Sequence, residues 1–202
     1  MDSLKGFETG SKLFTLTRLP MNILKTVNLT ESPWIRPRRV VYENDSGQVL
    51  SWDYIERVNA RSSVLVVPRF KKSGDLLFIR QYRVIFDCYV IGFPAGVISG
   101  DEDVEMCALR ELMEETGYTG KVVQTSPELT LNSALIKETA CCVVVELEED
   151  AVPKEQKLEP SEQIEVHRVK QDQIGAFFEQ AAARGDIIGG GPWYMLLAAQ
   201  YL

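Results

Sequence analysis

Residues 103–116 constrain this chain more than any other segment, because they place three glutamates on one face of a predicted helix. Glu111 and Glu115 are four residues apart, and Glu114 follows Glu111 by three; such spacings bring side chains together on a helix. Like charges this close repel one another and weaken an isolated helix. A hard divalent cation with oxygen ligands offsets such repulsion, so the segment is a candidate metal site, although three glutamates alone more often form a solvated surface. A solvated acidic face is the alternative.

Residues at both ends of this segment, and along its other side, also favour a helix. Asp103 can cap the first turn, and Gly117 stands where helices commonly end. Ala108, Leu109 and Leu112 share an adjoining apolar face, which can pack against a sheet. We therefore expect a helix that packs its apolar face on a sheet and carries the three carboxylates on an adjoining face.

The rest of the chain alternates short strand-like runs with turns. Turn residues at 43–47 and 71–75 each separate a pair of strands. Residues 94–101 are expected to form a loop, and residues 151–161 a mobile loop. The expected strands are 38–42, 48–57, 63–68, 76–81, 89–93, 121–123, 140–147 and 164–169, with a possible strand at 13–19.

Two helical segments, 172–184 and 192–202, are expected to close the chain, with the glycines at 189–191 between them acting as a hinge. The order of elements predicts an α+β fold with a mixed sheet, one internal helix and C-terminal helices. A change in composition near residues 60–61 divides the chain into a β-rich N-terminal segment, 1–60, and a main domain, 61–202.

Charge and hydropathy exclude several classes of protein. The formal net charge is −7, which argues against nucleic-acid binding, since that requires a basic face. An anionic small molecule is still possible as a substrate if a metal bridges it to carboxylates. No apolar run reaches about 18 residues, and the first residues lack the pattern of a secretion signal. No membrane partner and a cytoplasmic location are therefore expected.

The cysteines and the single histidine do not form a metal-binding pattern. Cys88, Cys107, Cys141 and Cys142 include no Cys-x-x-Cys pair, which favours buried thiols in a reducing compartment. No ligand spacing surrounds His167, the one histidine, so a zinc site is not expected.

The segment from Gly96 to Tyr118 resembles the Nudix box at each of its constrained positions. These positions are Gly96, Glu102, Arg110, Glu111, Leu112, Glu114, Glu115, Gly117 and Tyr118. Two further runs, IRQYR at 79–83 and GFPAG at 92–96, are similar to segments of ADP-ribose pyrophosphatases. The resemblance covers roughly residues 34–202.

This resemblance implies a Nudix α/β/α sandwich with an N-terminal antiparallel β-segment, often exchanged across a homodimer. The activity it implies is hydrolysis of the diphosphate of ADP-ribose or a similar nucleotide. It places Mg²⁺, or Mn²⁺, on Glu111, Glu115 and sometimes Glu114, with the carbonyl of Ala95 as a further ligand. The metal would neutralise the phosphates and acidify a bound water.

The general base implied by the resemblance is a glutamate in the loop before the last strand, and Glu162 matches this position best. Glu159 and Glu165 are rivals, and a solvated loop residue is the bland alternative. Arg110 is expected to orient the glutamates through charge-assisted hydrogen bonds. Glu102 could support the ligand set or bond the loop backbone.

Substrate contacts are expected from several parts of the chain. Arg83 could hold a phosphate, although a structural ion pair is an alternative, and Arg80 is a weaker candidate because strand alternation aims it at another face. Trp34 could stack on the base, and Trp52 is expected in the core. The remaining expected substrate contacts are Arg39, Gly96 and Val97.

Two departures from the ADP-ribose pattern concern the substrate. Gly92 stands where these enzymes commonly have glutamate, and Ser133 where they tend to have proline. An ADP- or GDP-hexose is therefore an alternative substrate. A different class of protein, a Nudix module that senses a nucleotide without cutting it, usually loses box glutamates, and none is lost here.

Overall fold

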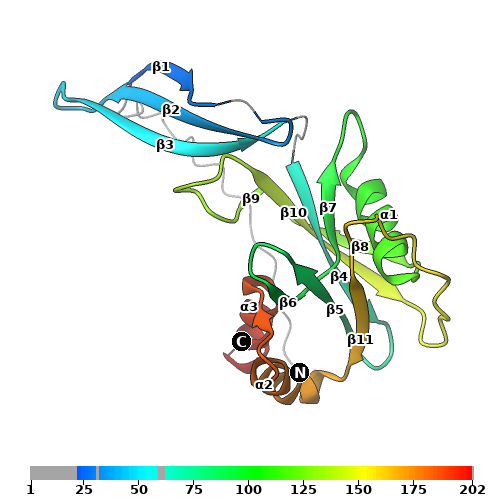
Figure 1. The fold of residues 1–202 in the computed structure, drawn as a ribbon. Coiled ribbons are helices and arrows are strands. Elements are labelled where there is room, and N and C mark those ends of the chain that lie inside the picture. Colours follow the sequence, from blue (N-terminus) through cyan, green and yellow to red (C-terminus); the bar gives the residue numbers. More distant parts are fainter. Residues whose placement is uncertain (1–21, 31, 59–61, 202) are drawn as a thin grey trace, which may run out of the picture.

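The computed structural model describes residues 22–30, 32–58 and 62–201, and it contains two sheets (Figure 1). The possible strand at 13–19 and the expected boundary at 60–61 lie outside the described residues. The first sheet is antiparallel, in the order β1-β2-β3. Its strands are β1 (Asn22–Asn28), β2 (Ile35–Glu43) and β3 (Val49–Arg57).

The predicted hairpin between β2 and β3 is confirmed, and the side chain of Asn44 shapes its turn. The Oδ1 of Asn44 accepts the backbone N–H of Ser46 at 3.1 Å and that of Gln48 at 2.9 Å. Gly47 has a φ of 81°, a backbone conformation that favours glycine. Local polar contacts therefore set the register of the hairpin.

The N-terminal sheet meets the rest of the chain through β3. Trp52 Nε1 donates to the carbonyl of Ala134 at 2.7 Å, and the backbone of Ile55 bonds both Leu135 and Lys137 at 2.8 Å. Trp52 is 52% exposed, so its expected place in the core was wrong. The apolar side chain lies on a sheet that no second layer covers within this chain, as far as the structure describes it.

The second sheet is mixed and has the order β12-β6-β5-β4-β10-β8. Strands β11, β7 and β9 pair with β5, β4 and β10, respectively. The pairs β4–β10 and β12–β6 are parallel, whereas the others are antiparallel. The strands are β4 (Ser62–Phe70), β5 (Leu76–Arg83), β6 (Cys88–Gly92), β7 (Ala95–Ile98), β8 (Lys121–Thr125), β9 (Leu129–Thr130), β10 (Thr139–Leu147), β11 (Ile164–Val169) and β12 (Ile187–Ile188).

Three short strands lie where none was expected. β7 occupies residues expected to form a loop, and β9 and β12 have two residues each. β7 is only four residues long, but Gly96 pairs with Val64 on the buried strand β4. Long-range pairing, rather than a local pattern, makes this segment a strand.

Helices cover both faces of the second sheet. α1 (Val104–Thr116) lies on one face, and α2 (Ile174–Ala183) and α3 (Gly190–Tyr201) lie on the other (Figure 1). A short 3₁₀ turn, η1 (Gln171–Gln173), precedes α2. Alternation along β4 serves both layers: Val64 and Val66 pack with α1, while Val67 packs with α2. The expected Nudix sandwich is therefore observed.

The expected caps of α1 are confirmed. The carboxylate of Asp103 accepts the N–H groups of Glu105 at 2.9 Å and Met106 at 3.4 Å. At the other end, Gly117 has a φ of 76° and donates its N–H to Met113 at 2.9 Å. The helix therefore begins and ends where its sequence predicts.

The segment 151–161 contains no helix or strand, as expected, and its backbone is bonded to the end of α1. Lys154 N donates to the carbonyl of Gly117 at 2.9 Å, and Lys157 N donates to that of Glu114 at 2.8 Å. A Cβ at Gly117 would lie 2.0 Å from the carbonyl oxygen of Lys154, so only glycine permits this approach. The segment thereby takes up carbonyl groups that a helix end leaves unpaired.

Arg80 fastens β5 to the turn before β12. Its guanidinium binds Asp186 at 2.8 and 2.9 Å and Glu165 at 3.0 Å, and it lies 3.6 Å from the ring centre of Tyr89. The Asp186 side chain is only 3% exposed. The Arg80 hydrogen bond is the main cause that holds the pKa of Asp186 below its ordinary value.

Asp186→Asn should therefore destabilise the fold by about 2–4 kcal/mol at pH 7, because it leaves Arg80 without its main buried partner. A carboxylate with a lowered pKa stabilises the fold above its ordinary pKa and loses this effect as pH falls through the folded value. The difference between the two proteins should thus shrink below about pH 4. Urea unfolding across this range measures it. Asp172→Asn, at an exposed position, is the control; equal stability of wild type and Asp186→Asn at pH 7 would contradict the assignment.

Candidate active site

A pocket of about 480 Å³ opens where β7, α1 and the segment 151–161 meet. It contains most of the residues expected to act, from three separate parts of the sequence. The lining residues are Ala95, Gly96, Val97, Ser99, Glu102, Arg110, Glu111, Glu114, Lys157, Glu159 and Glu162. The wall contains five glutamates, whose negative charges repel one another. Cationic side chains, a metal ion or both are needed to offset this repulsion.

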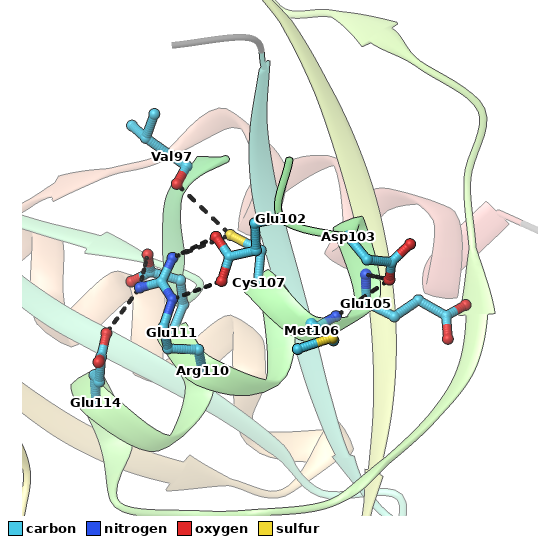
Figure 2. A network of polar contacts seen from close by, with 9 residues as sticks. All are labelled: Val97, Glu102, Asp103, Glu105, Met106, Cys107, Arg110, Glu111 and Glu114. Carbon is cyan, nitrogen blue, oxygen red and sulfur yellow. Dashed lines mark hydrogen bonds and ion pairs between the residues drawn. The ribbon is translucent and has the colours of Figure 1, made fainter. Parts of the chain in front are cut away.

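Arg110 organises the carboxylates of the pocket (Figure 2). Its Nε and Nη2 donate to the two oxygens of Glu102 at 2.9 and 3.0 Å. Its Nη1 donates to Glu111 at 2.7 Å and to Glu114 at 2.9 Å. This forked geometry is the strongest that arginine makes with a carboxylate. The Arg110 side chain thus contacts three glutamates at once, and Glu102, on the loop before α1, anchors it.

Glu115 lies beneath the pocket, in the least favourable position for a charge. The residue is 3% exposed, and its Oε2 accepts the N–H of Ala95 at 3.0 Å. Burial raises the pKa of Glu115 to about 8, and the neighbouring carboxylates of Glu111 and Glu162 add to this, against the Ala95 hydrogen bond and Arg83. In the described part of the chain, no lysine or arginine forms an ion pair with it.

Glu111 reaches the same region from the neighbouring turn of α1. Its carboxyl group lies over Gly96: a Cβ at Gly96 would come within 1.9 Å of the carboxyl carbon. Burial raises the pKa of Glu111 as well, although Arg110 opposes this. The absence of a side chain at Gly96 is therefore what lets the helix carboxylate touch β7.

The carboxylates fit a divalent cation by their chemistry. Among the described residues, no three Asp, Glu, His or Cys side chains converge on one point, because Glu111 and Glu114 are turned toward Arg110. The donors are nevertheless hard oxygens, which Mg²⁺ prefers. Glu115 is a buried carboxyl group held by a single N–H. A cation would offset the cost of ionising Glu115 and would draw the flexible Glu111 toward it.

The three candidate bases lie in different surroundings. Glu162 and Glu159 both line the pocket, and the Glu162 carboxylate accepts the backbone N–H of Glu159 at 2.8 Å. Glu165 is on β11 and is paired with Arg80 at 3.0 Å, outside the pocket lining. The negative charge of Glu162 contributes to the raised pKa of both Glu111 and Glu115, after the larger effect of burial.

The expected substrate residues are only partly brought together. Gly96 and Val97 line the pocket, and Arg83, exposed at the end of β5, is near enough to lower the pKa of Glu115. Trp34 is 76% exposed on the N-terminal sheet, and Arg39 is bonded to Asp53 at 2.6 and 2.7 Å. Neither lines the pocket of its own chain.

Arg80, the weaker phosphate candidate, is held by Asp186 on another face, as strand alternation predicted. Ser133 lines a different pocket of about 310 Å³, beside Trp52 and Tyr54. Lys157 also lines the acidic pocket but gives no signal in the sequence, because its position depends on a backbone contact with a helix far away in the sequence.

Comparisons with known proteins agree with this geometry. The NUDIX domain family matches residues 59–188. A Caenorhabditis elegans protein whose name places it among nudix hydrolases is 33% identical over 81% of this chain and 78% of its own length. An ADP-ribose pyrophosphatase of Saccharomyces cerevisiae is 31% identical over 70% of this chain, and an ADP-sugar pyrophosphatase of Mus musculus is 29% identical over 60%.

The matches span 66% and 59% of the yeast and mouse proteins, respectively. A crystal structure of an ADP compounds hydrolase superposes with a TM-score of 0.67 at 23% identity, covering 81% of this chain and 85% of that one. At this identity the superposition shows a shared fold. No helix among the described residues is long and apolar enough to span a membrane.

Proposed function

The chain belongs to the Nudix family of pyrophosphatases, and on that premise we propose that it is a Mg²⁺-dependent hydrolase of ADP-ribose or a closely related ADP-sugar. The observation that carries the proposal is the buried Glu115, a carboxyl group with a single N–H partner beneath a pocket lined by glutamates. A carboxyl group buried with so few partners is costly to ionise, and a bound cation would offset this cost. A diphosphate is the ligand that would share this cation.

Each residue of the pocket then has a chemical role. Glu111 and Glu115, with Glu114 and the carbonyl of Ala95, would hold Mg²⁺ (or Mn²⁺), which when bound neutralises the phosphates and lowers the pKa of a water molecule. Arg110 orients Glu111 and Glu114, which both accept a hydrogen bond from its Nη1. Glu162 would take a proton from a water molecule while the oxygen of that water attacks one phosphorus.

The bond that breaks joins that phosphorus to the bridging oxygen. The electron pair leaves with the other phosphate, and the products are a nucleoside monophosphate and a sugar phosphate. Arg83, at the end of β5, would contact a phosphate oxygen, and Gly96 and Val97, which line the pocket, would contact the substrate as well. No protein group changes its oxidation state.

The names of two relatives favour ADP-linked sugars as substrates. The departures at Gly92 and Ser133 leave an ADP- or GDP-hexose as the alternative. The non-catalytic sensor is disfavoured because every box glutamate is present, and Glu111, Glu114 and Glu115 all lie at or beneath the pocket.

The N-terminal segment, 1–60, is proposed to contribute to a homodimer, while residues 61–202 form the catalytic domain. Support comes from the exposed apolar surface of the first sheet, including Trp34 at 76% and Leu24 at 50%. Neither Trp34 nor Arg39 lines the pocket of its own chain, and in a dimer they would contact the base of a nucleotide bound to the partner.

A cytoplasmic location is also proposed. Cys107 is fully buried, and burial raises the pKa of its thiol to about 12, so the thiol stays protonated and unreactive. This agrees with a reducing compartment.

A substrate panel tests the proposed function. Purified protein is incubated with ADP-ribose, ADP-glucose, GDP-mannose, UDP-glucose and a dinucleotide, with Mg²⁺ or with excess chelator. We expect release of AMP from the ADP-sugars with Mg²⁺ and none with chelator. Tight nucleotide binding without turnover would favour the sensor, and equal rates in chelator would overturn the metal site.

Gly96→Ala should lower this activity by about 10²-fold while preserving the fold, because the new methyl group displaces the Glu111 carboxylate. The clash is with the end of a flexible side chain, so the melting temperature should change little. Gly175→Ala is a matched control, since a Cβ there meets nothing within 4 Å. A fully active Gly96→Ala would show that the position of Glu111 is not important.

A further inference from the structure

The charges on the pocket wall are unbalanced, with five glutamates facing two cations. One of these cations, Arg110, has all its nitrogens engaged with Glu102, Glu111, Glu114 and the Cys107 sulfur. The other is Lys157, which is exposed. Within the described residues, no carboxylate forms an ion pair with Lys157. Its ammonium group is therefore available for a ligand.

The backbone around Lys157 is fixed relative to the carboxylate helix. Lys157 N donates to Glu114 O at 2.8 Å, and Lys154 N donates to Gly117 O at 2.9 Å. Between them, the side-chain amide of Gln156 contacts the carbonyls of Glu115 and Ile164. These hydrogen bonds hold the segment against the last turn of α1, and Lys157 is one of the residues that line the pocket.

We propose that Lys157 is a substrate-binding residue that contacts a non-bridging oxygen of the diphosphate, an inference that rests on the proposed function. A diphosphate entering this pocket meets glutamates on most sides, and a cation held by them can contact only some of its oxygens. A compact ammonium group on a flexible stem suits a phosphate oxygen. The non-bridging oxygen of the diphosphate is already negatively charged before the reaction. The contact with Lys157 therefore stabilises the bound substrate and the transition state alike.

The effect of removing this contact is accordingly on KM. Lys157→Gln should raise the KM for ADP-ribose about tenfold, with kcat changed by less than about twofold; the size allows for the exposure of the lysine. Lys157→Arg keeps the positive charge, so its KM for ADP-ribose should be close to that of the wild type. Lys154→Gln is the matched control, because it removes an exposed charge from the same segment outside the pocket lining; its KM should equal that of wild type.

Steady-state kinetics with ADP-ribose and saturating Mg²⁺, on variants shown by melting temperature to be folded, give the answer. If the wild type is active and Lys157→Gln has the same KM as the wild type, this inference is overturned, while the proposed function stands. A tenfold rise that Lys154→Gln reproduces would also overturn it, since general electrostatics would then suffice. If wild type leaves ADP-ribose intact, the proposed function fails, and the inference fails with it.

Discussion

Glu115→Gln is expected to reduce Mg²⁺-dependent hydrolysis of ADP-ribose by at least about 10³-fold, because a neutral amide no longer offsets the charge of the metal. The substitution keeps an oxygen that can accept the Ala95 N–H, and it removes a buried carboxyl group whose raised pKa makes it costly to ionise. The melting temperature in chelator should therefore be no lower than that of wild type. Loss of activity without loss of stability separates a metal ligand from a structural residue.

Glu105→Gln provides the comparison for this variant. Glu105 is an exposed glutamate in the first turn of the same helix, where its side chain contacts Thr125 at 3.1 Å. It should retain wild-type kcat. If Glu115→Gln also retained wild-type kcat, the metal assignment would be refuted.

Glu162→Gln should lower kcat by about 10²-fold or more if this residue is the general base. Glu162 lines the pocket, and its charge contributes to the raised pKa of both Glu111 and Glu115. Substrate binding should be nearly unchanged, because the amide occupies the same volume. The kcat values of this variant, measured with saturating ADP-ribose and Mg²⁺, test the assignment.

Two further variants decide between the candidates. Glu165→Gln should retain full activity, because its carboxylate is paired with Arg80 outside the pocket. Glu159→Gln should have a smaller effect than Glu162→Gln, since Glu159 contacts Glu162 through its backbone N–H. Normal activity of Glu162→Gln would transfer the role to whichever of the other two proves defective.

The carboxylate helix could be predicted in detail because its determinants are local. The cap at Asp103, the left-handed Gly117 and the spacing of the glutamates all lie within one segment, and each was found where expected. The hairpin at Asn44 is of the same kind, since its turn is formed by side-chain contacts to residues two and four positions away.

Features that depend on distant parts of the chain could not be predicted in this way. β7 becomes a strand through pairing with β4. Asp186 contacts Arg80 across 106 residues of sequence. Trp52 is of a type common in cores, but it lies on the N-terminal sheet, outside the two core clusters, and is 52% exposed. Lys157 gave no signal, because its position depends on the backbone of α1.

A crystal structure with Mg²⁺ and an ADP-ribose analogue in which a methylene group replaces the bridging oxygen is the most direct measurement. We expect at least one Mg²⁺ bound by Glu111 and Glu115 and shared with the phosphates, with Glu162 facing the attacked phosphorus. Analogue bound with the α1 glutamates still paired only with Arg110, and no metal between them and the phosphates, would contradict the account.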